Sequence, residues 1–166
     1  MLKRFWAWYE RNHHWNLAVS SILFLWQLVH LYWLTTDVVW ARLFVYSIFN
    51  PSEVWRFLLV IVDYTEIPAL ITTSILYANE HRKKWAFKNI LFLIFLNAQW
   101  LHLFWITDEF VVSRFAEAGS IVALPIWLAW TAILIDYLEL PVIFDTTWKF
   151  LKQLRDRSFG KRSQQS

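Results

Sequence analysis

Apolar residues occur in four long runs, separated by short segments that contain most of the polar residues. The runs cover residues 15–36, 54–77, 85–107 and 121–144. A helix rises about 1.5 Å per residue, so about 20 apolar residues cross the hydrocarbon core of a bilayer, which is about 30 Å thick. The pattern therefore predicts an all-α integral membrane protein in which the four helices pack as a four-helix bundle.

The composition excludes several classes of protein and of functional site. Of the 166 residues, 58% are hydrophobic and 20% are aromatic, and only two are Gly, which excludes an ordinary soluble domain. Because the chain contains no Cys, disulfides, thiolate metal sites and thiol catalysis are also excluded. The first run lacks a small-residue cleavage site, so we interpret it as a retained span and not as a signal peptide.

Basic residues lie mostly on one side of the predicted membrane. Thirteen of the sixteen Lys and Arg precede the first run, surround the turn between the second and third runs, or follow the fourth run. The other three are Arg42, Arg56 and Arg114. By the positive-inside rule, both termini and the middle turn are predicted to be cytoplasmic, in a plasma or inner membrane. The net charge of +3 fits anionic membrane lipids as partners and gives no case for nucleic-acid binding.

Polar residues repeat between the two halves of the chain more faithfully than apolar residues do. The segment HLYWLTTD from His30 matches HLFWITDE from His102, and DYTEIP from Asp63 matches DYLELP from Asp136. We interpret each half as a helical hairpin and expect a pseudo-twofold axis along the membrane normal to relate the two. Residues at matching positions are then expected to have matching roles.

The repeat also predicts how the chain is organised. Residues 15–78 form the first hairpin and residues 85–146 the second, and the whole chain is a single transmembrane domain. Residues 147–166 form a basic tail, in which a short helix is expected to lie in the inner membrane interface. The two outer connections, residues 37–49 and 108–119, are expected to form short surface helices.

Six ionisable residues fall near the middle of the predicted spans: His30, Asp63, Glu66, His102, Asp136 and Glu139. Each costs roughly 2.5 to 3.5 kcal/mol to place in a membrane span, so six at similar depth need a common explanation. The carboxylates form two pairs of residues three apart, and each pair therefore shares one helix face. For the second pair to reach the depth of the histidines, the fourth helix must continue past Phe144.

Two imidazoles and four carboxylates are the ligands of a dinuclear metal site in a four-helix bundle. Two divalent ions would also neutralise the four negative charges in a medium that disfavours net charge. Zn²⁺ and Fe²⁺ are the expected ions, since imidazole and carboxylate ligands together suit both. The sequence therefore predicts a membrane-embedded centre that holds two divalent metal ions.

At these residues the sequence resembles the dimetal-carboxylate four-helix bundles, which include the ferritin-like proteins and their designed minimal models. The resemblance covers the six predicted ligands and the bundle, and it implies a pair of metal ions bound between the helices. The Glu-x-x-His pairing of that family is absent. Here His30 and His102 stand alone on their helices, and the carboxylates are paired as Asp-x-x-Glu.

Two pairs of residues are expected to support the centre. Gln27 and Gln99 lie one turn before each His, where an amide could hydrogen-bond a ligand and fix its orientation. A hydrogen bond between helices is an equally good interpretation of both amides. Pro68 and Pro141 lack the N–H that would bond the carbonyl four residues earlier, so each carboxylate-bearing helix is predicted to bend at the site.

A dinuclear centre is consistent with several functions, and the sequence leaves them open. An iron pair would suggest oxygen-dependent oxidation of a lipid, a quinone or another small apolar substrate, and a zinc pair would suggest hydrolysis by a bridging hydroxide. The metals can use all six ligands and no separate nucleophile is visible, so a non-catalytic site also stays open. The sequence does not decide whether the chain forms a homo-oligomer.

Three other interpretations of the same residues remain. The carboxylates and histidines could form a relay in a proton or cation transporter. His30 and His102 could bind a haem through two axial imidazoles, although four carboxylates at that depth have no role in haem binding. The six side chains could also form a buried ion-pair network that only holds the bundle together.

Overall fold

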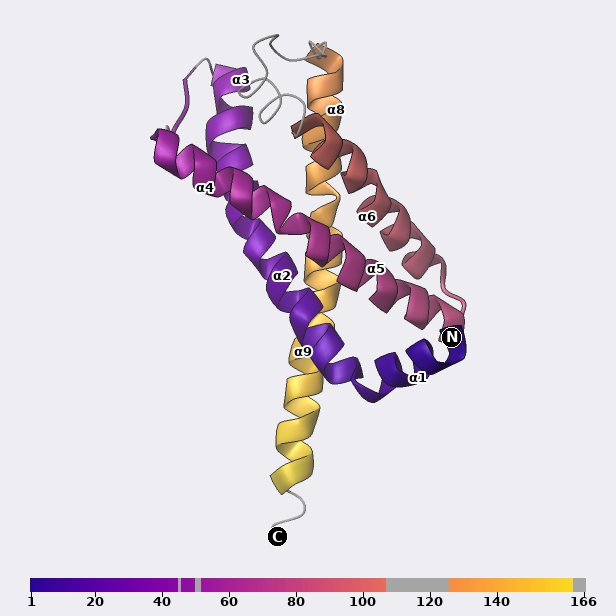
Figure 1. Cartoon of the computed structure of the whole chain (residues 1–166). Coiled ribbons are helices and arrows are strands. Elements are labelled where there is room, and N and C mark those ends of the chain that lie inside the picture. Colours follow the sequence, from indigo (N-terminus) through magenta and orange to yellow (C-terminus); the bar gives the residue numbers. More distant parts are fainter. Residues whose placement is uncertain (45, 50–51, 107–125, 163–166) are drawn as a thin grey trace.

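The structure is a computed structural model that describes residues 1–44, 46–49, 52–106 and 126–162. Within these residues every regular element is a helix, as the apolar runs predict. Figure 1 shows long helical segments that run in alternating directions, with a short helix lying across one end. Both the N-terminus and the C-terminal part of the chain lie at that end.

The helices follow the predicted runs closely, and two of the four long segments are interrupted near their middle. The elements in chain order are α1 (Leu2–Arg11), α2 (His13–Trp33), the π-helix η1 (Leu34–Val39), α3 (Trp40–Phe44), α4 (Glu53–Tyr64), α5 (Glu66–Lys83), α6 (Phe87–Ile106), α8 (Ile126–Tyr137) and α9 (Glu139–Arg162). Four stretches are long and apolar enough to span a membrane: His13–Phe44, Phe57–Lys83, Phe87–Phe104 and Ile126–Arg157.

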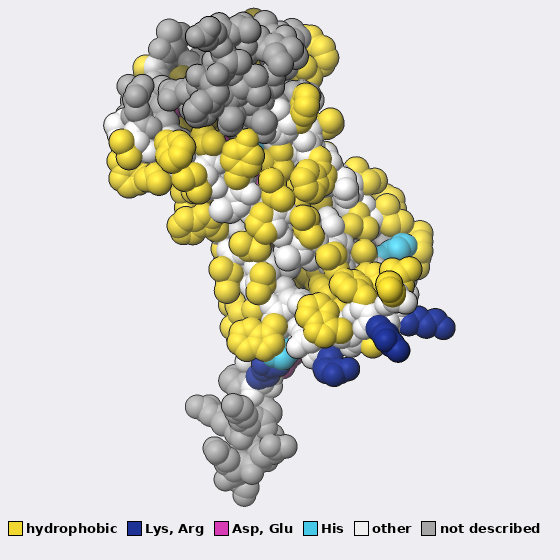
Figure 2. Space-filling view, viewed as in Figure 1, with side chains coloured by type: hydrophobic (Ala, Val, Ile, Leu, Met, Phe, Trp, Pro, Cys, Tyr) yellow, Lys and Arg dark blue, Asp and Glu magenta, His cyan; other side chains and the backbone are white. Residues whose placement is uncertain are grey.

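The surface of the molecule is divided into an apolar flank and a charged end. Figure 2 shows hydrophobic side chains over the flank and Lys and Arg side chains gathered at the end where α1 lies. We call this end the basic end. Its described basic residues are Lys3, Arg4, Arg11, Arg82, Lys83, Lys84, Lys88, Lys149, Lys152, Arg155 and Arg157. An exposed apolar belt bounded by charge is the surface expected of a helical protein in a bilayer.

The long helices form a closed ring of contacts. Helix α2 packs against α5 and α9, and α6 packs against α5 and α8. Each long helix contributes side chains to one shared core, whose most deeply buried side chains include Phe24, Ala69, Leu70, Leu96 and Val142. The polar residues on these inner faces are therefore brought together in the middle of the ring.

The helix interruptions occur where the prolines predict them. Helix α4 gives way to α5 at Thr65, and α8 gives way to α9 at Leu138. Each interruption lies three residues before a proline, Pro68 or Pro141, whose missing N–H leaves the carbonyl of the preceding turn without its helical partner. The chain tightens there, because Thr65 N–H donates to Val62 O at 2.9 Å and Leu138 N–H donates to Ile135 O at 2.9 Å.

Two helices extend further than the sequence suggested. The first continues beyond residue 36 through η1 and α3 to Phe44, so these residues are not a separate surface helix. Helix α9 passes Phe144, as the depth of the carboxylates predicted, and continues without a break to Arg162, so the basic tail is not a separate interfacial helix. No proline occurs in either extension, and without such a break the helical hydrogen bonds continue. The expected helix at 108–119 lies outside the described residues.

Candidate metal centre

The six predicted ligands lie on four different parts of the ring. His30 is on α2 and His102 is on α6, while the carboxylates flank the two interruptions, with Asp63 and Glu66 on either side of Thr65. The second pair flanks Leu138 in the same way. All six side chains are buried, none more than 6% exposed. The structure therefore places every predicted ligand in the core, where an ionised group needs a partner.

His30 lies between carboxylates from the two hairpins. Its Nδ1 is 2.5 Å from Oδ1 of Asp63, and its Nε2 is 3.7 Å from Oδ2 of Asp136. An ionised carboxylate can only accept, so the first contact fixes the ring proton on Nδ1. In a neutral imidazole the lone pair of Nε2 would then face Asp136, in the tautomer that a metal ligand requires.

His102 completes a compact group of nitrogen and oxygen atoms. Its Nδ1 lies 3.0 Å from Oδ1 of Asp136, and its ring lies edge to face with that of His30, with 5.8 Å between the centroids. One ligand atom from each of His30, His102 and Asp136 falls within 4.8 Å of the others. Two ligands bound to one tetrahedral zinc ion at about 2.1 Å lie roughly 3.4 Å apart, so the 3.7 Å between Nε2 and Oδ2 is suitable for an ion.

Several polar atoms of the group make no hydrogen bond to any of the described residues. Oδ2 of Asp136 and both ring nitrogens of His102 are buried and have no hydrogen-bond partner among these residues. The contact of His102 Nδ1 with Asp136 is short, but it lacks the geometry of a hydrogen bond. A buried polar atom without a hydrogen bond costs about 1–3 kcal/mol, and such atoms in a folded protein usually mark an ion, a water or a reactive group. The donor types and their spacing fit a divalent metal ion, so this buried group could bind one.

The remaining carboxylates, Glu66 and Glu139, pair with each other. The two carboxyl groups lie close enough to interact, and two buried like charges at short range favour a shared proton. One oxygen of each pair member, Oε1 of Glu66 and Oε2 of Glu139, is buried without a partner among the described residues. The structure thus shows a group of histidines with aspartates and a separate pair of glutamates, and it does not show all six residues as one ligand cluster.

The two glutamines bond the neighbouring helix at its interruption. Gln27 Nε2 donates to Oγ1 of Thr65 at 3.0 Å, and Gln99 Nε2 donates to the carbonyl of Ile135 at 2.7 Å. These hydrogen bonds connect helices, which was one of the two interpretations of the sequence. Within the described chain the carbonyl oxygen of Gln99 is buried and unpaired, so contact between this amide and a bound group stays a prediction.

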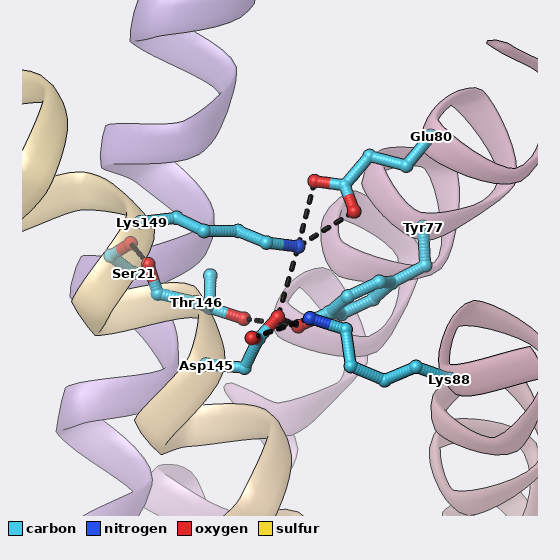
Figure 3. A network of polar contacts seen from close by, with 7 residues as sticks. All are labelled: Ser21, Tyr77, Glu80, Lys88, Asp145, Thr146 and Lys149. Carbon is cyan, nitrogen blue, oxygen red and sulfur yellow. Dashed lines mark hydrogen bonds and ion pairs between the residues drawn. The ribbon is translucent and has the colours of Figure 1, made fainter. Parts of the chain in front are cut away.

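A second polar network lies at the basic end, and the sequence did not predict it. Figure 3 shows Lys149 of α9 between two acidic side chains: its Nζ donates to Glu80 at 2.6 Å and lies 2.9 Å from Asp145. Asp145 also accepts from Lys88 at 2.8 Å and from the hydroxyl of Tyr77 at 2.8 Å. The only sequence signal was that both acids lie within a basic region, which does not identify their partners.

Comparisons of the chain with protein-family models, with curated proteins and with solved structures found no match. The function proposed below therefore rests on the residues of this chain alone.

Proposed function

We propose that the protein is an integral membrane metal-binding protein whose buried centre holds two divalent ions. The observation that supports this proposal best is the convergence of His30, His102 and Asp136, whose ligand atoms lie within 4.8 Å of one another in the core. Histidine and carboxylate ligands together suit Zn²⁺ and Fe²⁺. The positive-inside rule favours an orientation with the basic end, and so both termini, in the cytoplasm.

The first ion would be held by His30 Nε2, His102 and Asp136. Asp63, which the sequence suggested as a ligand, would instead hold His30 in place through the 2.5 Å contact with Nδ1. Carboxylate–histidine–metal arrangements of this kind fix the imidazole tautomer and make the ring a better ligand. Asp136 would join the two histidines, because one of its oxygens faces each of them.

The second ion would be held between Glu66 and Glu139. These two carboxyl groups come from different hairpins and interact with each other, and each has a buried oxygen without a partner in the described part of the chain. An ion would replace the proton that two neighbouring buried carboxyl groups favour sharing. With two divalent ions and four carboxylates, the centre would carry no net charge, which favours burial.

Metal titration of the purified protein tests this proposal. After removal of bound ions in detergent, we expect the wild type to take up two equivalents of Zn²⁺ or Fe²⁺ per chain. A variant with His30→Ala, His102→Ala and Asp136→Asn should lose the first ion. The His14→Ala variant is the matched control, because His14 lies outside the centre near the basic end. Equal uptake by the wild type and the triple variant would contradict the proposal.

A further inference from the structure

Three helices carry polar residues at intervals of seven, from the level of the centre toward the basic end. They are Gln27, Ser20 and His13 on α2, Glu66, Thr73 and Glu80 on α5, and Glu139, Thr146 and Gln153 on α9. Residues seven apart lie on the same face of a helix, about 10.5 Å apart along its axis. The nine residues therefore form three levels, and we call them the polar ladder.

The middle level of the ladder consists of hydroxyl groups inside the apolar core. Ser20, Thr73 and Thr146 are each 0% exposed. Thr146 contacts the hydroxyl of Tyr77 at 3.1 Å, but Ser20 Oγ and Thr73 Oγ1 have no hydrogen-bond partner in the described part of the chain. An apolar side chain of the same shape would avoid leaving a buried hydroxyl unpaired, so the two hydroxyls point to something polar that passes or binds between the helices.

The lowest level of the ladder lies at an open groove at the basic end. This groove has a volume of about 500 Å³ and is lined by His13, Glu80 and Gln153, one from each of the three helices, together with Leu17, Lys149, Lys152, Asp156 and Arg157. This volume is large enough for a hydrated ion. Glu80 lies at its wall and is held there by Lys149, as Figure 3 shows. The ladder thus runs from solvent at the basic end toward the level of the buried carboxylates.

On the other side of the centre the described core positions are apolar. One turn from His30, Asp63 and Asp136 in the direction away from the basic end, the inner positions are occupied by Leu34, Leu59 and Ile133, and all three are buried. Among the described core residues, polar groups at regular spacing therefore continue from the centre in one direction, toward the basic end.

Apolar side chains separate the upper and middle levels of the ladder. Leu70 and Val142 are fully buried there, with the small residue Ala69 beside them on α5 between Glu66 and Thr73. An ion can pass this region only when the helices move apart, since the interior of a protein is closely packed. Passage should therefore be slow enough to measure.

We propose that divalent ions reach the buried centre from the basic end, along the route formed by Glu80, Thr73 and Glu66 of α5 and the buried hydroxyls of Ser20 on α2 and Thr146 on α9. Carboxylate and hydroxyl oxygens can replace the water ligands of a divalent ion one after another. This inference rests on the proposed function, because it describes how the same centre is loaded.

The rate of ion uptake by the Thr73→Val variant tests the route. Valine has nearly the shape of threonine, and the lost hydroxyl has no partner among the described residues, so the variant should fold and melt no lower than the wild type. Loss of one oxygen from the route should slow Zn²⁺ uptake by metal-free protein roughly tenfold or more, with the final stoichiometry unchanged. Thr72→Val is the matched control, because the Thr72 hydroxyl bonds the carbonyls of Pro68 and Ala69 instead.

Uptake in oriented vesicles tests the direction. With metal-free protein in vesicles, Zn²⁺ added on the side of the basic end should be taken up faster than Zn²⁺ added on the opposite side. Uptake at the wild-type rate by Thr73→Val, or faster uptake from the opposite side, would contradict the proposed route. Neither result would contradict the proposed metal centre. If the wild type takes up no ion from either side, both the route and the proposed function are wrong.

Discussion

The Nδ1 atom of His30 lies 2.5 Å from Oδ1 of Asp63, and this contact joins α2 to the end of α4. It leaves Nε2 of the same ring directed at Asp136, 3.7 Å away. The two aspartates at matching positions of the repeat are thus expected to differ in role, one holding a ligand and the other serving as one.

Substitution of each aspartate by asparagine should separate these roles. The amide introduced by Asp63→Asn can donate to Nδ1 of His30 and favour the tautomer with a proton on Nε2. This variant should therefore bind the ion roughly 10- to 100-fold more weakly, without a change in the number of sites. Asp136→Asn should remove one bound ion. Isothermal titration of metal-free protein distinguishes the outcomes, with the exposed Asp156→Asn as control. Equal effects of the Asp63 and Asp136 variants would contradict the assignment.

The two histidines should contribute to a similar degree. Both are buried, and both have a ring nitrogen close to Asp136, so His30→Ala and His102→Ala should each lower the content of the first ion. Elemental analysis measures the metal content of both variants, with His81→Ala as the control. A variant that keeps the full wild-type content after losing either histidine would show that this residue is not a ligand.

Removal of the metal should destabilise the wild type at neutral pH. An ion present at a hundredfold excess over its Kd stabilises the folded state by about 2.7 kcal/mol, which corresponds to a melting temperature roughly 8 °C higher for a chain of this size. A variant with Asp63→Asn, Glu66→Gln, Asp136→Asn and Glu139→Gln should melt at the same temperature with and without chelator. An unchanged melting temperature of the wild type after complete metal removal would instead favour an ion-pair network or a relay.

The network at the basic end should stabilise the fold independently of the metal. Lys149 is only about a quarter exposed and neutralises both Glu80 and Asp145, so Lys149→Met should lower the free energy of unfolding by about 1–3 kcal/mol. Lys152→Met removes the same charge from an exposed position nearby and should change it by less than about 0.5 kcal/mol. Denaturant unfolding in detergent, with metal content measured in parallel, compares the two. An equal loss of unfolding free energy in the two variants would contradict a stabilising role for the contacts of Lys149 with Glu80 and Asp145.

Much of the fold could be predicted because its main signals are local. The length of an apolar run determines whether a helix can span a bilayer, and a missing proline N–H determines where a helix is interrupted. The interruptions at Thr65 and Leu138 follow from Pro68 and Pro141 in this way. The ends of the first and last helices could not be predicted as well, because neither extension contains a proline and polar residues such as Lys, Arg and Gln are good helix formers.

The site could be predicted as a set of residues but not as a set of contacts. Burial cost marks His30, Asp63 and Glu66 as a group. Spacing along a helix does not show, however, which oxygen faces which nitrogen across a helix interface, and side-chain rotamers decide that. For this reason the pairing of Glu66 with Glu139 and the contact between Lys149 and Glu80 became visible only in the structure.

The metal content of the protein as purified tests the central claim most directly. Elemental analysis of wild-type protein prepared without chelator should find two equivalents of Zn or Fe per chain, reduced in the variant that lacks His30, His102 and Asp136. Folded protein that contains no stoichiometric metal, and takes up none when Zn²⁺ or Fe²⁺ is added, would contradict the claim that these buried side chains form a metal centre.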